Sequence, residues 1–84
     1  MDPCVLVAVA RFPDRGHAIE ELANADEEFR SLCVDLADAE AAAVRWERSS
    51  SPMGEARSVE YRDLARDLAA ELNAALDRHP RGTG

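Results

Sequence analysis

Apolar residues recur at helical spacing in two long segments of the chain. In the first segment the steps alternate between three and four residues, and the positions are Phe29, Leu32, Leu36, Ala39, Ala43 and Trp46. In the second segment the apolar stripe is Tyr61, Leu64, Ala65, Leu68, Leu72, Ala75 and Leu76. Such spacing places each set on one face of an α-helix. We therefore predict an all-α fold in which long helices at about 26–48 and 56–78 pack as an antiparallel hairpin.

The ends of the two long helices are marked by capping and loop residues. Asn24, with Glu27 three residues later, and Asp26, followed by two glutamates, are both plausible N-caps for the first helix. Three serines, a proline and a glycine fall within residues 49–54, which is the composition of a loop. A proline follows His79, so residues 80–84 are expected to form a loose tail. The whole chain, residues 1–84, is then a single small helical domain.

The loop also sets an approximate register for the hairpin. If the loop is centred near Ser51, the residues expected to lie side by side are Trp46 with Arg57, Leu36 with Leu68, and Phe29 with Ala75. The ion pairs expected in this register are Glu47 with Arg57 and Glu28 with Arg78. Exposed ion pairs are each worth about 0.2 to 1 kcal/mol, so they would help to choose the register rather than drive folding.

The N-terminal segment is less clearly patterned. Asp2 and Pro3 are typical of a helix start, with Asp as the N-cap and Pro at the first helical position. Residues 4–12 are valine-rich and apolar on every side, so they fit either a helix or a strand. We favour a short helix, because no second strand pattern exists in the chain to pair with a strand. Pro13 would end this helix.

A second short helix is expected between Pro13 and Asp26. Asp14 is a candidate N-cap for it, and Ile19 and Leu22 would lie on its apolar side. These apolar residues, like those of residues 4–12, find no matching stripe within the predicted hairpin. We therefore expect one or two short helices before the hairpin.

Composition makes self-association an early expectation. Sixteen of the 39 apolar residues are alanine, which adds little apolar area per residue, so the core of a lone 84-residue chain would be marginal. Residues expected to contact a second copy or another protein are Val5, Val7, Val9, Phe12, Ile19, Leu22 and Trp46. For Trp46 two interpretations remain open, because an aromatic residue at the tip of a hairpin can cap the core or anchor an interface.

Charge and hydropathy exclude several other classes of protein. The formal net charge of −7 disfavours binding to nucleic acid or to anionic membranes, and the ten arginines are not clustered. The longest apolar run, residues 4–10, is too short to cross a bilayer and lacks the basic start of a signal peptide. We therefore expect a cytoplasmic protein that binds neither nucleic acid nor membranes.

Few residues suggest chemistry. Asp14, His17 and Glu20 are spaced three apart, as in helical metal sites, but a second set of ligands is missing, and a solvated His17 is the simpler interpretation. Cys4 and Cys33 form no metal or redox motif and are expected to behave as small apolar residues. No nucleophile motif or phosphate-binding loop is present, so we expect neither an enzyme nor a bound cofactor.

Several partial motifs together resemble a known family. Phe12-Pro13, then Ile19 and Leu22, then the D-x-x-F-x-x-L motif are followed by an acidic long helix, a loop and a closing helix. The motif residues are Asp26, Phe29 and Leu32. This order resembles the YdcH-like family of small bacterial helical proteins over nearly the whole chain. The resemblance implies a small soluble helical protein whose role is not established and which has no catalytic residues.

Three functions follow as hypotheses. The first is a self-associating module that binds other proteins through helices. The second is an oligomeric binder of a metal or small ligand through His17 and the neighbouring carboxylates. The third is an acidic, antitoxin-like regulator of a basic partner, based on the acidic side of the first long helix, although such a face is more often simply solvated.

Overall fold

The computed structural model describes residues 2–79, and helices account for nearly all of this range. They are α1 (Pro3–Arg11), the 3-10 turn η1 (Pro13–Arg15), α2 (Gly16–Ala25), α3 (Glu27–Glu47) and α4 (Gly54–Arg78). No strand occurs in this part of the chain, so the all-α prediction is confirmed and the N-terminal apolar segment is helical. The expected tail at residues 80–84 lies outside the described residues.

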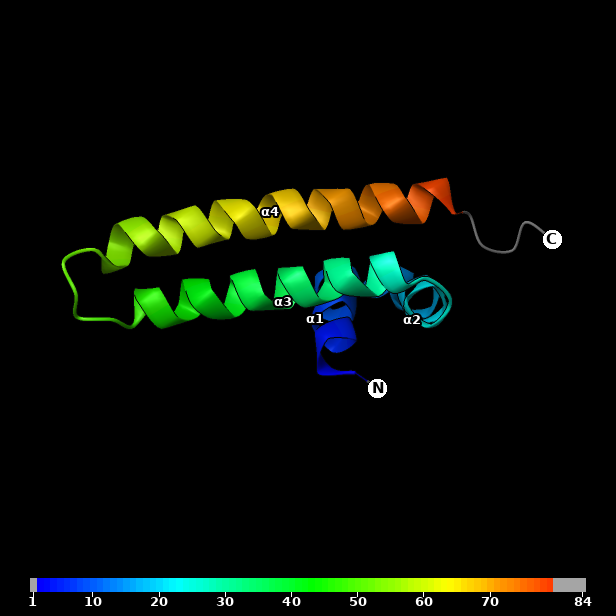
Figure 1. Ribbon diagram of the computed structural model, residues 1–84, viewed down its shortest axis with the longest axis horizontal. Coiled ribbons are helices and arrows are strands. Elements are labelled where there is room, and N and C mark those ends of the chain that lie inside the picture. Colours follow the sequence, from blue (N-terminus) through cyan, green and yellow to red (C-terminus); the bar gives the residue numbers. More distant parts are fainter. Residues whose placement is uncertain (1, 80–84) are drawn as a thin grey trace.

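The long helices α3 and α4 lie side by side and run in opposite directions, joined by the loop between them (Figure 1). The short helix α1 crosses α3 on the side away from α4, and α2 lies near the N-terminal end of α3 (Figure 1). The N-terminal half of α3 is therefore covered from two sides. Apart from the ion pair between Arg11 of α1 and Glu40, its C-terminal half, next to the loop, packs against α4.

Side-chain capping fixes the starts of α1 and α3. The Asp2 carboxylate accepts a hydrogen bond of 2.8 Å from the Cys4 N–H at the start of α1. Asp26 accepts hydrogen bonds from the backbone N–H groups of Glu28, at 2.9 Å, and Phe29, at 3.3 Å, at the start of α3. These interactions confirm Asp2 and Asp26 as N-caps.

The expected cap on α2 is wrong. Asp14 lies inside the 3-10 turn that begins at Pro13, so it comes too early to cap a helix that starts at Gly16. Arg15 occupies the N-cap position instead, and its side chain makes no capping hydrogen bond. The proline is the physical reason, because its fixed φ angle starts a turn immediately after α1.

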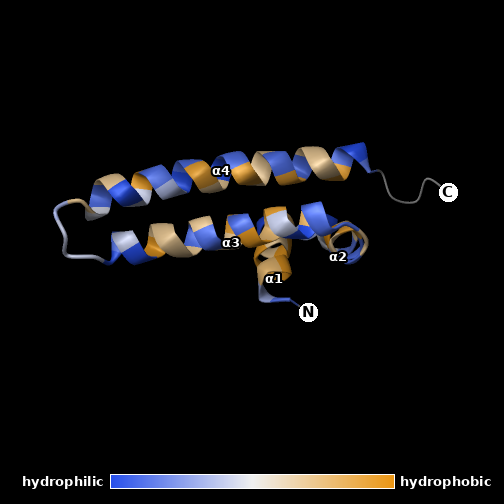
Figure 2. Cartoon of the chain, in the orientation of Figure 1, coloured by the Kyte–Doolittle hydropathy of each residue, from blue (hydrophilic) through white to orange (hydrophobic). Residues whose placement is uncertain are grey.

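The core lies where the four helices meet. Its largest fully buried side chains are Ile19, Cys33, Leu36, Leu72 and Leu76. Figure 2 shows that α1 is apolar over most of its surface, whereas apolar and polar residues alternate along α3 and α4. Because α1 and α2 pack on one side of α3 and α4 on another, the buried face of α3 is wider than the predicted stripe.

The contact between α3 and α4 near the loop is made from small residues. The buried residues there are Ala39, Ala42, Ala43, Gly54, Ser58 and Ala65. A Cβ atom added at Gly54 would lie 2.7 Å from the carbonyl oxygen of Trp46, so glycine is required for this close approach. Small side chains let the helices come close, but they bury little apolar area per residue.

The expected ion pairs between the long helices differ from those observed. Glu47 pairs with Arg62, whereas Arg57 pairs with Glu60 of its own helix at 2.9 Å. Glu28 and Arg78 line the same hollow, but residues 2–79 contain no ion pair between them. Flexible side chains reach a full helical turn along the axis, and a partner three residues away competes for each arginine.

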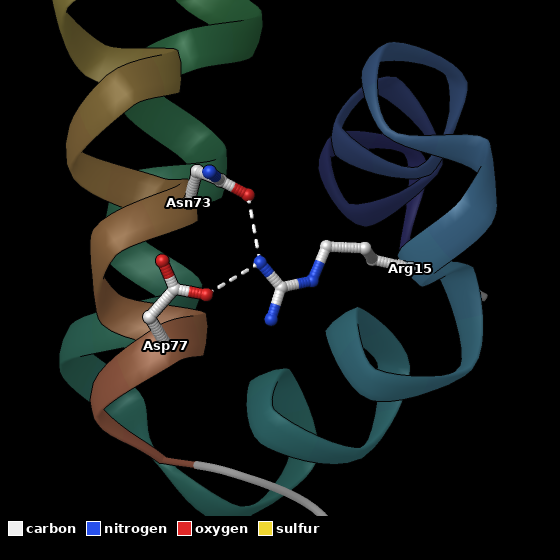
Figure 3. Close-up of polar contacts among 3 residues, drawn as sticks. All are labelled: Arg15, Asn73 and Asp77. Atoms are coloured by element: carbon white, nitrogen blue, oxygen red, sulfur yellow. Dashed lines mark hydrogen bonds and ion pairs between the residues drawn. The ribbon is translucent and has the colours of Figure 1, made fainter.

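One polar cluster joins the N-terminal part of the chain to α4. The Arg15 guanidinium donates a hydrogen bond of 2.9 Å to the Asn73 side-chain oxygen and another of 2.8 Å to the Asp77 carboxylate (Figure 3). Asn73 and Asp77 lie 58 and 62 positions from Arg15 in the sequence. This cluster holds the 3-10 turn against the C-terminal half of α4.

Candidate interaction surface

The N-terminal residues expected at an interface have two different environments. Val5 and Ile19 are only 4% and 0% exposed, because the core of the same chain covers them. The expectation that they lack a partner within the chain is therefore wrong, and neither side chain is available to a second copy in this packing. Four others are partly buried and pack against the outside of that core, namely Val7, Val9, Phe12 and Leu22. Trp46, in the last turn of α3, is also partly buried.

The large apolar residues that remain exposed gather in another part of the molecule. They are Leu6, Val44, Met53, Val59 and Leu64, each 44% to 50% exposed. All but Leu6 belong to the end of the α3–α4 pair nearest the loop or to the loop itself. Scattered exposed apolar residues are normal on a protein surface, and these residues do not form one patch, because Leu64 and Val44 line different hollows of the helix pair.

One of these residues lies in a hollow between the long helices, which we call the Tyr61 groove. Its floor is apolar and is formed by Ala39, Ala42, Tyr61, Leu64 and Leu68. Its charged residues are Asp35, Asp38 and Arg45, all on α3. The hollow has a volume of about 440 Å³. Leu64 was placed in the core stripe by the sequence, yet it is 45% exposed at this groove.

A second hollow, which we call the Arg62 groove, contains other residues of the same two helices. Ala43, Val44 and Ala65 supply its apolar part, and its charged residues are Arg11, Glu40, Arg62 and Arg66. Each of these charges has a partner within the chain. The ion pairs are Arg11–Glu40 at 3.2 Å, Arg62–Glu47, and Arg66–Asp63 at 3.0 Å.

The charges of the Tyr61 groove differ in this respect. Arg45, Asp35 and Asp38 are exposed, and none of them forms an ion pair or side-chain hydrogen bond with any residue in the 2–79 range. From the sequence, the two aspartates were predicted only to belong to the acidic side of the first long helix, and Arg45 was not singled out. The available signal was the seven-residue spacing of Asp38 and Arg45, which places opposite charges on one side of α3.

The structure does not bring the suggested metal ligands together. His17 is exposed and lies 3.2 Å from Glu21 rather than beside Asp14 or Glu20. Glu20 faces a different hollow, whose lining includes Asp2 and Arg30. In the part of the chain that the structure describes, no three His, Cys, Asp or Glu residues are grouped so that they could hold a metal ion.

The two cysteines are free thiols in different surroundings. Cys33 is fully buried beneath α1, and burial raises the pKa of its thiol to about 11. Cys4 is partly exposed, and burial together with the nearby Asp2 carboxylate raises the pKa of its thiol as well. Nucleophilic chemistry needs a thiolate, so neither environment favours a reactive cysteine at neutral pH.

Comparisons with protein-family models, curated proteins and solved structures found no match to this chain. Among residues 2–79, no helix has the length and apolar character needed to cross a bilayer.

Proposed function

We propose that this chain is a self-associating protein interaction module built on a helical hairpin. The observation that supports this proposal most strongly is the uncovered end of the α3–α4 pair. There the helices meet through alanine, serine and glycine, and Leu64 remains 45% exposed at the Tyr61 groove. Alanine, serine and glycine contacts bury little apolar area, so covering this end would add stability that the chain itself does not supply.

The module is proposed to work by binding and not by catalysis. Its hollows are shallow and lie between helices, and helix-against-helix packing is a common way to cover such a surface. The resemblance to the YdcH-like family is retained as part of this proposal, because that resemblance also implies a small helical protein without catalytic residues. The structure offers no observation that favours the metal-binding or antitoxin-like hypothesis over self-association.

The experiment is a measurement of mass in solution by sedimentation equilibrium over a range of protein concentrations. If the chain self-associates, its average mass in solution should rise with protein concentration from the chain mass of 9.2 kDa toward a multiple of that value. Circular dichroism on the same samples would show that the chain stays helical throughout. A folded chain that remains at the monomer mass at every concentration would contradict the proposal.

A further inference from the structure

The Tyr61 groove carries a charge pattern that is complementary to itself. Asp38 and Arg45 are seven residues apart, which is two helical turns, so they lie on the same side of α3 with opposite charges. Both are exposed and both lack an ion-pair partner within residues 2–79. A surface with an acid at one end and a base at the other matches a second copy of itself turned end over end.

The apolar floor has the same symmetry. The midpoint between Asp38 and Arg45 falls between residues 41 and 42 of α3, and the midpoint between Tyr61 and Leu64 falls between residues 62 and 63 of α4. Ala42 and Tyr61 line the same groove, so the two midpoints lie at the same level of the helix pair. One two-fold axis at that level therefore pairs both sets of residues at once.

We propose, building on the self-association proposed above, that a second copy of the chain docks on the Tyr61 groove as an antiparallel two-fold dimer. In this dimer α3 packs on the partner's α3 and α4 packs on the partner's α4. The result is a four-helix arrangement of two layers, with two helices from each copy. Arg45 of each copy meets Asp38 of the other, and Tyr61 of each copy meets Leu64 of the other. Asp35, one turn before Asp38, adds a second negative charge near the incoming arginine.

The opposite face does not provide this complementarity. Its arginines are already paired with Glu40, Glu47 and Asp63 of the same chain, so docking there would bury charges whose partners are fixed. The charges of the Tyr61 groove gain partners only when a second copy arrives. This difference is the reason to assign the dimer to one face of the α3–α4 pair and not the other.

The size of the contact indicates a dimer that dissociates on dilution. The two-fold axis would align residues 36–47 of α3 and residues 54–71 of α4 with their counterparts, lengths of about 18 Å and 27 Å. With helices about 10 Å wide, the contact covers about 450 Å² of each copy, or about 900 Å² in total. An area of this size falls among weak, transient interfaces, which bury less than about 1,200 Å², so the equilibrium should be measurable by dilution.

Charge reversal provides the test. Arg45→Glu and Asp38→Arg should each weaken the dimer about tenfold or more, because each places like charges together twice in every dimer. The combined variant, Arg45→Glu with Asp38→Arg, restores opposite charges and should return the dissociation constant to about the original value. The control is Arg66→Glu on the opposite face, which makes the same change in net charge as Arg45→Glu and should leave the dissociation constant unchanged.

The possible results separate this inference from the function on which it rests. All four variants change exposed residues, and circular dichroism would confirm that each remains helical. If the original chain never dimerises, self-association fails and this geometry fails with it, leaving a different protein as the occupant of the groove. If the chain dimerises but the single reversals have no effect, or the combined variant stays weak, the geometry is overturned and self-association stands.

Discussion

The difference between the covered and uncovered parts of the α3–α4 pair can be tested with two leucines of the same helix. Leu72 is 0% exposed and lies in the core, whereas Leu64 is 45% exposed at the Tyr61 groove. Truncating a fully buried leucine to alanine removes apolar contacts and leaves a cavity, which costs about 2.7 to 5 kcal/mol. A domain of this size has a total stability of only about 4 to 12 kcal/mol. Leu72→Ala should therefore remove a large share of the free energy of unfolding.

Leu64→Ala is the matched control, because it makes the same chemical change on the same helix. In dilute solution, where the chain is monomeric, this substitution should cost less than about 1 kcal/mol, since nearly half of the side chain is already in water. The assay is urea unfolding followed by circular dichroism at low protein concentration. The assignment of Leu72 to the core and of Leu64 to the open groove would be wrong if the two substitutions lowered the unfolding free energy equally. It would also be wrong if Leu72→Ala cost less than about 1 kcal/mol.

Three further predictions concern a buried thiol, a helix cap and a polar cluster. The pKa of Cys33 is about 11 in the folded chain against an ordinary value of 9.0, so stability should be constant below pH 9 and fall by about 2 to 3 kcal/mol between pH 9 and 11. Unfolding of Cys33→Ala across this pH range should lack that part of the loss. Asp26→Ala removes the N-cap of α3 and should cost about 1 kcal/mol in urea unfolding, whereas Asp26→Asn should retain most of the cap. Arg15→Ala breaks its bonds to Asn73 and Asp77 and should cost about 1 kcal/mol, with faster amide hydrogen exchange in α2 as the local readout.

Local signals in the sequence predicted the helices well. Asp2 with Pro3, and Asp26 with its following glutamates, mark helix starts that the structure confirms by hydrogen bonds. The serine-rich segment before Gly54 marks the loop in the same way. These features depend on neighbouring residues only, so they can be read without knowledge of the tertiary structure. Asp14 failed as a cap because the 3-10 turn after Pro13 was not visible in the pattern.

Features that depend on neighbouring helices were harder to predict. Cys33 and Ala42 are buried although they lie beside the predicted stripe, because two layers pack on α3 at different angles. Val5 and Ile19 looked unpartnered, since periodicity says which side of a helix is apolar but not which element covers it. Leu64 was assigned to the core for the same reason, although α4 turns it toward the open groove.

The candidate surface was only partly foreseen. Self-association followed from the high alanine content, but the expected interface was placed mainly on the N-terminal helices. The structure moves the exposed apolar residues to the opposite end of the α3–α4 pair, because α1 and α2 use much of their own apolar surface to cover α3. The opposite charges of Asp38 and Arg45 gained meaning only once their lack of partners within residues 2–79 was known.

The proposed dimer can be detected in the unmodified chain by recording amide NMR spectra over a dilution series. If the chain dimerises through the Tyr61 groove, a dilution of about a hundredfold should shift the resonances of the groove residues together along one binding curve. These residues are Ala42, Arg45, Tyr61 and Leu64. Resonances of α1, and of Val59 on the other side of α4, should stay in place. Spectra that do not change with concentration, or shifts confined to α1 or to Val59, would contradict a dimer that forms through the Tyr61 groove.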